Sequence, residues 1–390
     1  MTTMDGPTGS PWRLGQAVAL GGALLILSAC GEGEEANSAD GVEEWAPPGA
    51  EEAEAPDAAL EEAGEGPAGP VGPPSDEELA AALAESSYLG PVGDAGRAVI
   101  TGDTTPEEEE IDPDAPWVET EKDREILHET VTWAREQGLQ ELPMGEIMGL
   151  VGSTFVGVPY RESPLEVPGD ERLVVDLRGM DCVTFVEQVL AMSRLVREVS
   201  EEDLDDPEAL AEQFRDVLTT LRYRDGELDG YLSRLHYFSE WISDNEAKGL
   251  VEDLTRGMGG EAVTEPISFM SSNPDAYRQL DEEPDLVDEI RSVEETLSDG
   301  ERYVIPQDEI ARLEEGIRTG DIIAATSTVE GLDVAHTGLA FWHQGRLHLL
   351  HAPLEDGTVE ISERPLAERI QNIDGQDGII VARPLDPGGA

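Results

Sequence analysis

The sequence predicts an α+β fold in which a helical first half precedes an antiparallel sheet. In the first half, apolar residues recur at three- and four-residue spacing, which indicates helices over residues 121–136, 144–155, 182–199, 207–221 and 231–248. In the second half, short runs rich in Ile, Val, Leu and aromatic residues are separated by turn residues. These runs indicate strands over residues 321–326, 335–342, 347–351 and 378–382.

The charge balance excludes one class of partner. The chain holds 86 Asp and Glu residues against 25 Lys and Arg, which gives a net charge of -61, and only 5% of its residues are aromatic. Binding to nucleic acid needs a cationic surface that neutralises phosphates. We therefore expect no nucleic acid partner, and no residue pattern indicates a cofactor.

The N-terminus has the pattern of an export signal. Arg13 precedes an apolar run over residues 17–27, which is too short to span a bilayer but suits the core of a signal peptide. The run ends in Leu-Ser-Ala-Cys at residues 27–30, which resembles the lipobox of bacterial lipoproteins. The resemblance implies that residues 1–29 are removed and that Cys30 carries a lipid, which would anchor the protein in the cell envelope outside the cytoplasm. The alternative is a buried helix that ends in an incidental cysteine.

The segment that follows has the composition of a tether. Residues 30–115 are mainly Glu, Ala, Gly, Pro and Asp, with few large apolar side chains. Such a segment cannot bury enough surface to fold, and a flexible chain of this length spans on the order of 50 Å. Apolar periodicity then persists over residues 116–386, roughly 270 residues, which is enough for one domain with its own core.

Cys182 is the first candidate for chemistry. It follows Asp181, a good N-cap, and opens a run that is apolar nearly all round, which predicts a buried helix that begins at the thiol. A thiol in the first turn lies near the positive end of the helix dipole and near unpaired backbone N–H groups. We therefore expect a lowered thiol pKa and an oxyanion site. The alternative is a small buried apolar residue, since free cysteine often packs in cores.

Two histidines are predicted to lie side by side on the sheet. Gln344 and Gly345 suit a two-residue hairpin turn between the strands that hold them. With that turn, His351 is the diagonal neighbour of His336 on one face, about 7–8 Å away at the backbone, so the two imidazoles can hydrogen-bond. We expect His336 to act as a base and His351 to orient it.

The other two strand histidines have the opposite parity. His343 and His348 are expected on the other face, with a surface or core role. A zinc site is the competing use of the strand histidines. Because His348 and His351 point to opposite faces and no cysteine or carboxylate stands beside them at ligand spacing, we expect no metal.

The order of several motifs resembles a known family. The NlpC-type branch of papain-like cell-wall hydrolases has a similar order of motifs, which here are Gly157-Val158-Pro159-Tyr160, Asp181-Cys182, Thr319-Gly320-Asp321, His336-Thr337-Gly338 and Leu350-His351-Ala352. The sequence departs from the common branch at residues 183–187, where Val-Thr-Phe-Val-Glu follows the cysteine in place of Ser-Gly. This variant, with residues 231–242, 331–338 and 378–384, resembles the N-acetylmuramoyl-L-alanine amidase-like subfamily over nearly all of the predicted domain.

The resemblance implies a papain-like cysteine hydrolase whose nucleophile helix packs on the sheet. It would cut the amide between the muramyl lactyl group and L-alanine in peptidoglycan fragments (muropeptides). Cys182 would attack the carbonyl, His336 would protonate the leaving amine, and His351 would hold the His336 tautomer. Tyr160 would lie near the oxyanion, with Asp181 also in the substrate site. Three alternatives stay open: a cut between D-glutamate and diaminopimelate, binding of muropeptides without cleavage, and acyl transfer onto lipid.

Residues 231–242 are a candidate for substrate contacts. Ser233, Tyr237 and Trp241 fall at four-residue spacing, on one face of the predicted helix. Arg234 adds a guanidinium suited to the carboxylates of a stem peptide. The alternative is that the aromatic residues pack against the core and Arg234 reaches water.

Overall fold

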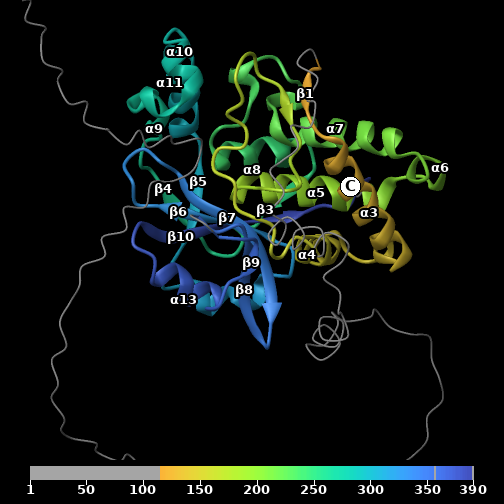
Figure 1. Ribbon diagram of the computed structural model, residues 1–390. Coiled ribbons are helices and arrows are strands. Elements are labelled where there is room, and N and C mark those ends of the chain that lie inside the picture. The colour runs from red at the N-terminus through yellow and green to blue at the C-terminus, as the bar shows by residue number, and fades with distance from the viewer. Residues whose placement is uncertain (1–114, 355–356, 389–390) are drawn as a thin grey trace, which may run out of the picture.

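A computed structural model of the protein describes residues 115–354 and 357–388, and Figure 1 draws them in colour. The predicted signal peptide, the lipid on Cys30 and nearly all of the predicted tether lie outside these residues. Within the described ranges, no helix is both long and apolar enough to cross a bilayer.

The helices of the first half follow the predicted order. The α-helices of the described residues are α3 (Glu121–Glu136), α4 (Met144–Ser153), α5 (Cys182–Glu198), α6 (Glu201–Leu204), α7 (Pro207–Arg222), α8 (Phe238–Ala247), α9 (Phe269–Ser272), α10 (Arg278–Glu282), α11 (Leu286–Asp299), α12 (Ile310–Leu313) and α13 (Leu366–Gln371). The predictions for α3, α4, α5 and α7 are confirmed, because their observed ends fall within two residues of the expected ones.

An antiparallel sheet lies in the second half, and the helices α9 to α13, which were not predicted, lie between its strands in the chain. The strands are β1 (Trp117–Val118), β2 (Leu173–Val174), β3 (Val251–Asp253), β4 (Glu261–Val263), β5 (Arg302–Pro306), β6 (Ile322–Ser327), β7 (Val334–His343), β8 (Arg346–His351), β9 (Glu360–Ile361) and β10 (Gln376–Pro384). The order is β4-β5-β10-β6-β7-β8-β9, with β3 also paired to β10, and each of these pairs is antiparallel. Strands β1 and β2 form a separate parallel pair. The predicted α+β class is confirmed.

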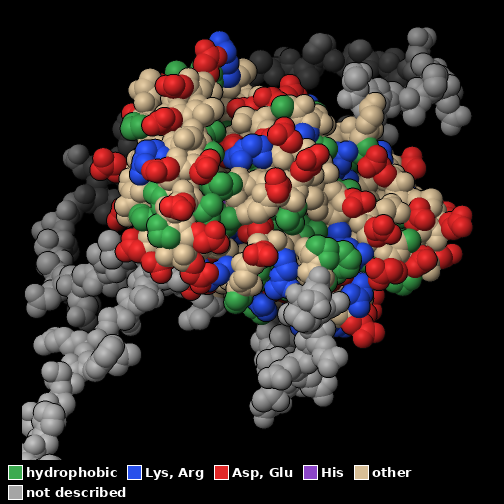
Figure 2. Space-filling model, turned by 90° about the horizontal axis from the view of Figure 1, so that it is seen from above, with side chains coloured by type: hydrophobic (Ala, Val, Ile, Leu, Met, Phe, Trp, Pro, Cys, Tyr) green, Lys and Arg blue, Asp and Glu red, His purple; other side chains and the backbone are tan. Residues whose placement is uncertain are grey.

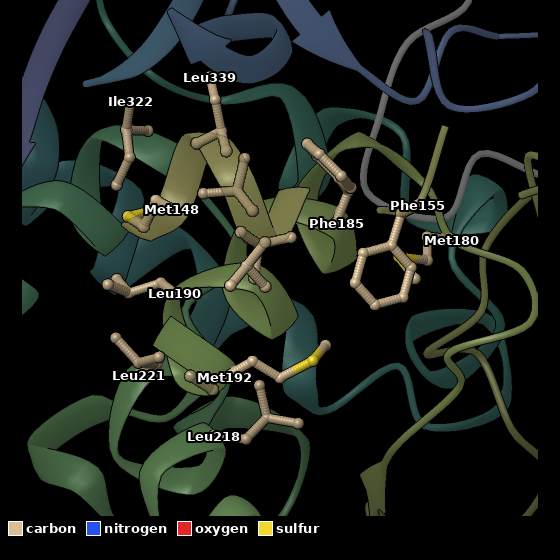
Figure 3. Packing of buried hydrophobic residues seen from close by; sticks show 14 of the residues in the cluster. Met148, Phe155, Met180, Phe185, Leu190, Met192, Leu218, Leu221, Ile322 and Leu339 are labelled. Carbon is tan, nitrogen blue, oxygen red and sulfur yellow. The ribbon is translucent and has the colours of Figure 1, made fainter. Parts of the chain in front are cut away.

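The sheet separates two apolar cores. Figure 1 shows α3, α4, α5, α7 and α8 on one side of the sheet and α13 on the other, with α9, α10 and α11 grouped at one end. The larger core lies around α5. In Figure 3, Phe185 and Leu190 of this helix stand among Met148 of α4, Leu218 of α7 and Leu339 of β7. Each such fully buried side chain stabilises the fold by about 1.5–3 kcal/mol.

Few large apolar side chains of the described residues are exposed. Val329 is the one large hydrophobic side chain among the described residues that counts as exposed. In the view from above, acidic side chains are spread over the surface with Lys and Arg between them (Figure 2). The apolar faces of the described helices and strands therefore pack against one another.

The predicted helix over residues 231–248 is wrong in its first part. Residues Tyr231–Ser233 form a short 3-10 turn, and α8 begins only at Phe238. Gly230 has a φ of 76°, and Arg234 is extended and forms an isolated β-bridge with Tyr223. The backbone here pairs with the end of α7 instead of with itself, so Ser233 and Trp241 do not share a helical face.

The predicted hairpin is confirmed. Gln344 and Gly345 have φ values of 50° and 73°, as a two-residue turn with both central residues at positive φ requires. His343 pairs with Arg346, and Leu339 pairs with Leu350. This register makes His351 the diagonal neighbour of His336, as the sequence predicts.

A glycine contact between α4 and the loop before β6 is expected to be important for stability. Gly320 has a φ of +82°, and a Cβ there would lie 1.8 Å from the Gly145 carbonyl oxygen. We predict that Gly320→Ala lowers the free energy of unfolding by about 2–4 kcal/mol, because both the strained conformation and the clash must be accommodated. Urea unfolding measures this loss.

Gly249→Ala is the matched control for that measurement. Gly249 has a φ of +71°, but a Cβ there would meet nothing within 4 Å. Only the conformational cost of roughly 1–2 kcal/mol is expected. Equal losses in the two variants would contradict the importance of the contact with Gly145.

Candidate active site

The thiol of Cys182 lies in the first turn of α5, as predicted. The side chain of Asp181 accepts a hydrogen bond from the Thr184 backbone at 2.8 Å, and the Thr184 hydroxyl accepts one from the Asp181 backbone at 3.0 Å. This reciprocal capping box satisfies two backbone donors and fixes the start of the helix. The helix is buried along most of its length, which agrees with its apolar sequence.

Thr337 of β7 joins the helix start to the sheet. Its hydroxyl donates to the carbonyl of Cys182 at 2.8 Å, and both residues are buried. Such a bond contributes about 1 kcal/mol to stability and holds the first turn against the strand next to His336. The role of Thr337 was not predicted. No local sequence signal reveals it, because the hydrogen bond joins residues 155 positions apart in the chain.

The expectation of a lowered thiol pKa is wrong for this structure. Burial and then the charge of Asp181 raise the pKa of Cys182 to about 12, while hydrogen bonds from the backbone and hydroxyl of Thr337 act in the opposite direction. The thiol is almost completely buried, and desolvation of the thiolate outweighs the helix dipole. At neutral pH the resting site therefore holds a protonated thiol.

The two predicted histidines are in contact. Nε2 of His336 lies 2.8 Å from Nδ1 of His351, and the rings meet edge to face with centroids 4.8 Å apart. Burial, followed by the charge of Arg369, lowers the pKa of His336 to about 3, and the same effects with His336 itself lower the pKa of His351. Both imidazoles are therefore neutral at neutral pH, and each contact nitrogen has a defined role as donor or acceptor.

The opposite parity of His343 and His348 is also confirmed. Their rings contact each other with centroids 5.7 Å apart, and Nδ1 of His348 lies 2.7 Å from the Ser362 carbonyl oxygen. Across residues 115–354 and 357–388, no group of three or more His, Cys, Asp or Glu residues is arranged to hold a metal ion.

One cavity contains both the thiol and the base. It has a volume of about 80 Å³, and its walls include Asp181, Cys182, His336, Arg234 and Tyr237. Of the other predicted site residues, Tyr160 lies close by. Burial and then the charges of Cys182 and Asp181 raise the pKa of its phenol.

The structure does not bring Ser233 or Trp241 to the cavity wall. The Ser233 hydroxyl donates to the Gly230 carbonyl within the turn, at 2.7 Å. The Trp241 indole is fully buried and donates to Oε1 of Glu187 at 3.2 Å. Their contact with a substrate stays a prediction.

Arg234 and Tyr237 line the cavity, but their polar groups are already engaged. Arg234 is 5% exposed, and its guanidinium lies 2.6 Å from Glu166 and 3.5 Å from Glu171. The Tyr237 hydroxyl donates to Glu294 of α11 at 2.7 Å. These contacts tie the cavity wall to neighbouring segments, so a ligand would meet a paired guanidinium instead of a free one.

A buried ion pair that was not predicted also lines the cavity. Nε of Arg222 lies 2.7 Å from Oε2 of Glu187, and both side chains are at most 2% exposed. Nη1 of Arg222 also donates to the Val174 carbonyl at 2.6 Å. Because the partners come from α7 and α5, their pairing depends on helix packing, which no local sequence signal reveals. The pair adds no net charge beside the thiol.

This arrangement can carry out nucleophilic acyl transfer. A thiol at a helix N-terminus supplies the nucleophile, its first-turn N–H groups can stabilise an oxyanion, and a neutral imidazole in the same cavity can accept the thiol proton. Because Nε2 of His336 contacts His351, Nδ1 is the ring nitrogen of His336 that remains available for this proton. The fold and site together therefore have the features of a nucleophilic hydrolase.

Comparison with known protein families assigns this protein to one family. The family described as AmiA-like, N-acetylmuramoyl-L-alanine amidase-like, matches residues 150–379. The match covers more than half of the chain and contains the cavity, so this protein belongs to that family. A comparison with curated proteins gave no match.

Solved structures agree with the family. Two crystal structures of an N-acetylmuramoyl-L-alanine amidase from Bacteroides uniformis are 37% and 38% identical to this chain, with TM-scores of 0.58 and 0.57. Each covers 62% of this chain, and 99% and 98% of the solved chains are covered. A Bacteroides fragilis structure provisionally named a xylanase is 36% identical, with a TM-score of 0.55, and covers 60% of this chain and 98% of its own.

The buried imidazoles predict how stability depends on pH. The pKa of His336 is about 3 in the folded state against an ordinary value of 6.5, so unfolding takes up a proton in this range. Its contribution to stability is complete above about pH 6.5 and is lost as the pH falls towards about 3. We predict that His336→Gln lowers the pH slope of the unfolding free energy by up to about 1.4 kcal/mol per pH unit. Urea unfolding between about pH 6 and 4 measures the slope, and equal slopes would contradict the neutral burial of His336.

Proposed function

We propose that this protein is a peptidoglycan amidase that hydrolyses the amide between the muramyl lactyl group and L-alanine in cell-wall fragments, through a thioester on Cys182. The observation that carries the proposal is the His336–His351 contact of 2.8 Å beside a cavity that also contains the thiol. Membership of the amidase-like family and the name of the Bacteroides uniformis relatives support the substrate class.

The first step transfers the thiol proton and forms the thioester. Nε2 of His336 is engaged by His351, so Nδ1 accepts the proton from Cys182 while the sulfur attacks the amide carbonyl carbon. With a thiol pKa of about 12 and a His336 pKa of about 3, a stable thiolate–imidazolium pair is unfavourable in the resting site. Proton transfer therefore accompanies the attack. The backbone N–H of Cys182 and the nearby phenol of Tyr160 are the expected donors to the oxyanion.

The second half of the reaction releases both products. Protonated His336 donates its proton to the amine of the L-alanine as the C–N bond breaks, which leaves the lactyl group as a thioester on Cys182. Neutral His336 then takes a proton from water, and the resulting hydroxide attacks the thioester carbonyl. The lactyl carboxylate leaves, and the thiol is protonated again.

The setting of this enzyme follows from the N-terminal sequence. We propose a papain-like fold of the NlpC type and a lipid anchor on Cys30 at the membrane, outside the cytoplasm. Residues 30–115 would then carry the domain towards peptidoglycan fragments. The lipobox-like Leu-Ser-Ala-Cys at residues 27–30 and the motif order around Cys182 and His336 support these proposals.

Replacing the nucleophile tests the mechanism. We predict that Cys182→Ala lowers the release of stem peptide from a purified muropeptide by at least about 10³-fold, because the alanine lacks the sulfur that forms the thioester. Its stability should change by only about 1–3 kcal/mol. Ser193→Ala is the matched control and should leave activity unchanged, since it also removes one heavy atom from a buried side chain of α5 but donates to the Val189 carbonyl at 2.7 Å and does not line the cavity.

Mass spectrometry of the products separates the alternatives. The proposed cut yields the free amino sugar and a peptide that begins with L-alanine, whereas a D-glutamyl-diaminopimelate endopeptidase leaves a dipeptide on the sugar. Binding without turnover would identify a muropeptide-binding protein. Full activity in Cys182→Ala would refute the thioester mechanism.

A further inference from the structure

One ring nitrogen of the histidine pair, Nε2 of His351, has no role in the proposed reaction. His351 is completely buried, and its Nε2 makes no hydrogen bond to any of the residues that the structure describes. Among residues 115–354 and 357–388, the carboxylate within 4 Å of this nitrogen is that of Glu360 in β9, whose Oε1 lies 3.8 Å away. Glu360 is the residue that pairs with His351 in the β8–β9 register, so the sheet itself sets them side by side.

We propose that Glu360 is a positioning residue that completes a chain from Cys182 through His336 and His351, and that it fixes the tautomers of both imidazoles. This inference rests on the proposed function and adds a residue to it. Glu360 does not touch the cavity and acts only through His351.

The tautomers follow from counting protons along the chain. For His336 to accept the thiol proton at Nδ1, its own proton must sit on Nε2 and be donated to Nδ1 of His351. His351 then carries its proton on Nε2, which requires an acceptor. Within the described part of the chain, Glu360 is the carboxylate within reach. The opposite tautomers would place a proton on Nδ1 of His336 and block the base.

The geometry allows this hydrogen bond to close. At 3.8 Å the His351–Glu360 contact is longer than a hydrogen bond, but the Glu360 side chain is 51% exposed and free to change rotamer. The buried donor on His351 has no such freedom. Leaving it without an acceptor costs about 1–3 kcal/mol, so the flexible carboxylate is the group expected to move.

The negative charge of Glu360 also offsets the positive charge of Arg369, which acts on both histidines. The charged or titratable groups that face His351 are His336 on β7, Glu360 on β9 and Arg369 on α13. The charge of Arg369 lowers the pKa of both histidines, and the charge of Glu360 raises the pKa of Arg369. Without Glu360, Arg369 would act unopposed, and protonated His336 would be harder to form when the amine must leave.

Two substitutions of Glu360 test its role. Glu360→Ala removes the acceptor, so kcat should fall by about 10- to 100-fold with KM little changed, the size of effect seen when an orienting partner is lost. Glu360→Gln keeps an acceptor oxygen but loses the charge, so its kcat should fall less.

In both variants the acid limb of the kcat/KM profile should move to lower pH, because imidazolium formation loses an anionic neighbour. Glu363→Ala, an exposed residue of the same edge, should behave as the unchanged protein.

A second measurement separates this inference from the proposed function. Nitrogen-15 NMR of the histidine side chains reports the tautomers without any substrate. We expect His351 to carry its proton on Nε2 in the unchanged protein and in Glu360→Gln, and to lose this preference in Glu360→Ala. Identical tautomers in all three proteins would overturn the role of Glu360. Inactivity of the unchanged protein on muropeptides, with the tautomer shift intact, would refute only the proposed function.

Discussion

The attachment of one helix start to one strand is the contact on which the site depends. Asp181 and Thr184 fix where α5 begins, and the Thr337 hydroxyl bonds the first carbonyl of that helix to β7. Because His336 directly precedes Thr337, the same contact holds the strand segment that contains the base beside the start of the helix. The apolar side chains of α5 then supply the stabilisation that keeps the helix against the sheet.

Burial of the site also determines which of its groups carry a charge. The whole chain carries a net charge of -61, yet Cys182 and His336 are neutral, and Arg222 and Arg234 in the cavity wall are paired with carboxylates. Desolvation raises the pKa of Cys182 and lowers that of His336, and Arg222 lies against Glu187. A buried site of this kind strengthens every hydrogen bond within it and makes an unpaired charge costly. Catalysis there requires the proton transfer from Cys182 to His336 to occur together with formation of the carbon–sulfur bond.

Apolar periodicity predicted the long packed helices, such as α5 and α7, and turn chemistry predicted the hairpin at Gln344. Periodicity failed where the backbone of one segment pairs with the backbone of a distant segment. Arg234 is extended because it bridges to Tyr223, although its neighbours have helical spacing. The short strands β3, β4 and β9 were also missed, since two or three residues carry too little pattern to be recognised before their partners are known.

The sequence by itself determined the fold class, the helix that begins at Cys182, and the diagonal contact between His336 and His351. Each of these follows from local periodicity, capping or a two-residue turn, which act over a few neighbouring residues. Only the tertiary structure decided that the thiol is protonated, that Arg234 is already paired, and that Glu360 lies behind His351. Burial and ion pairing join residues far apart in the chain, so their effects appear only once the chain has packed.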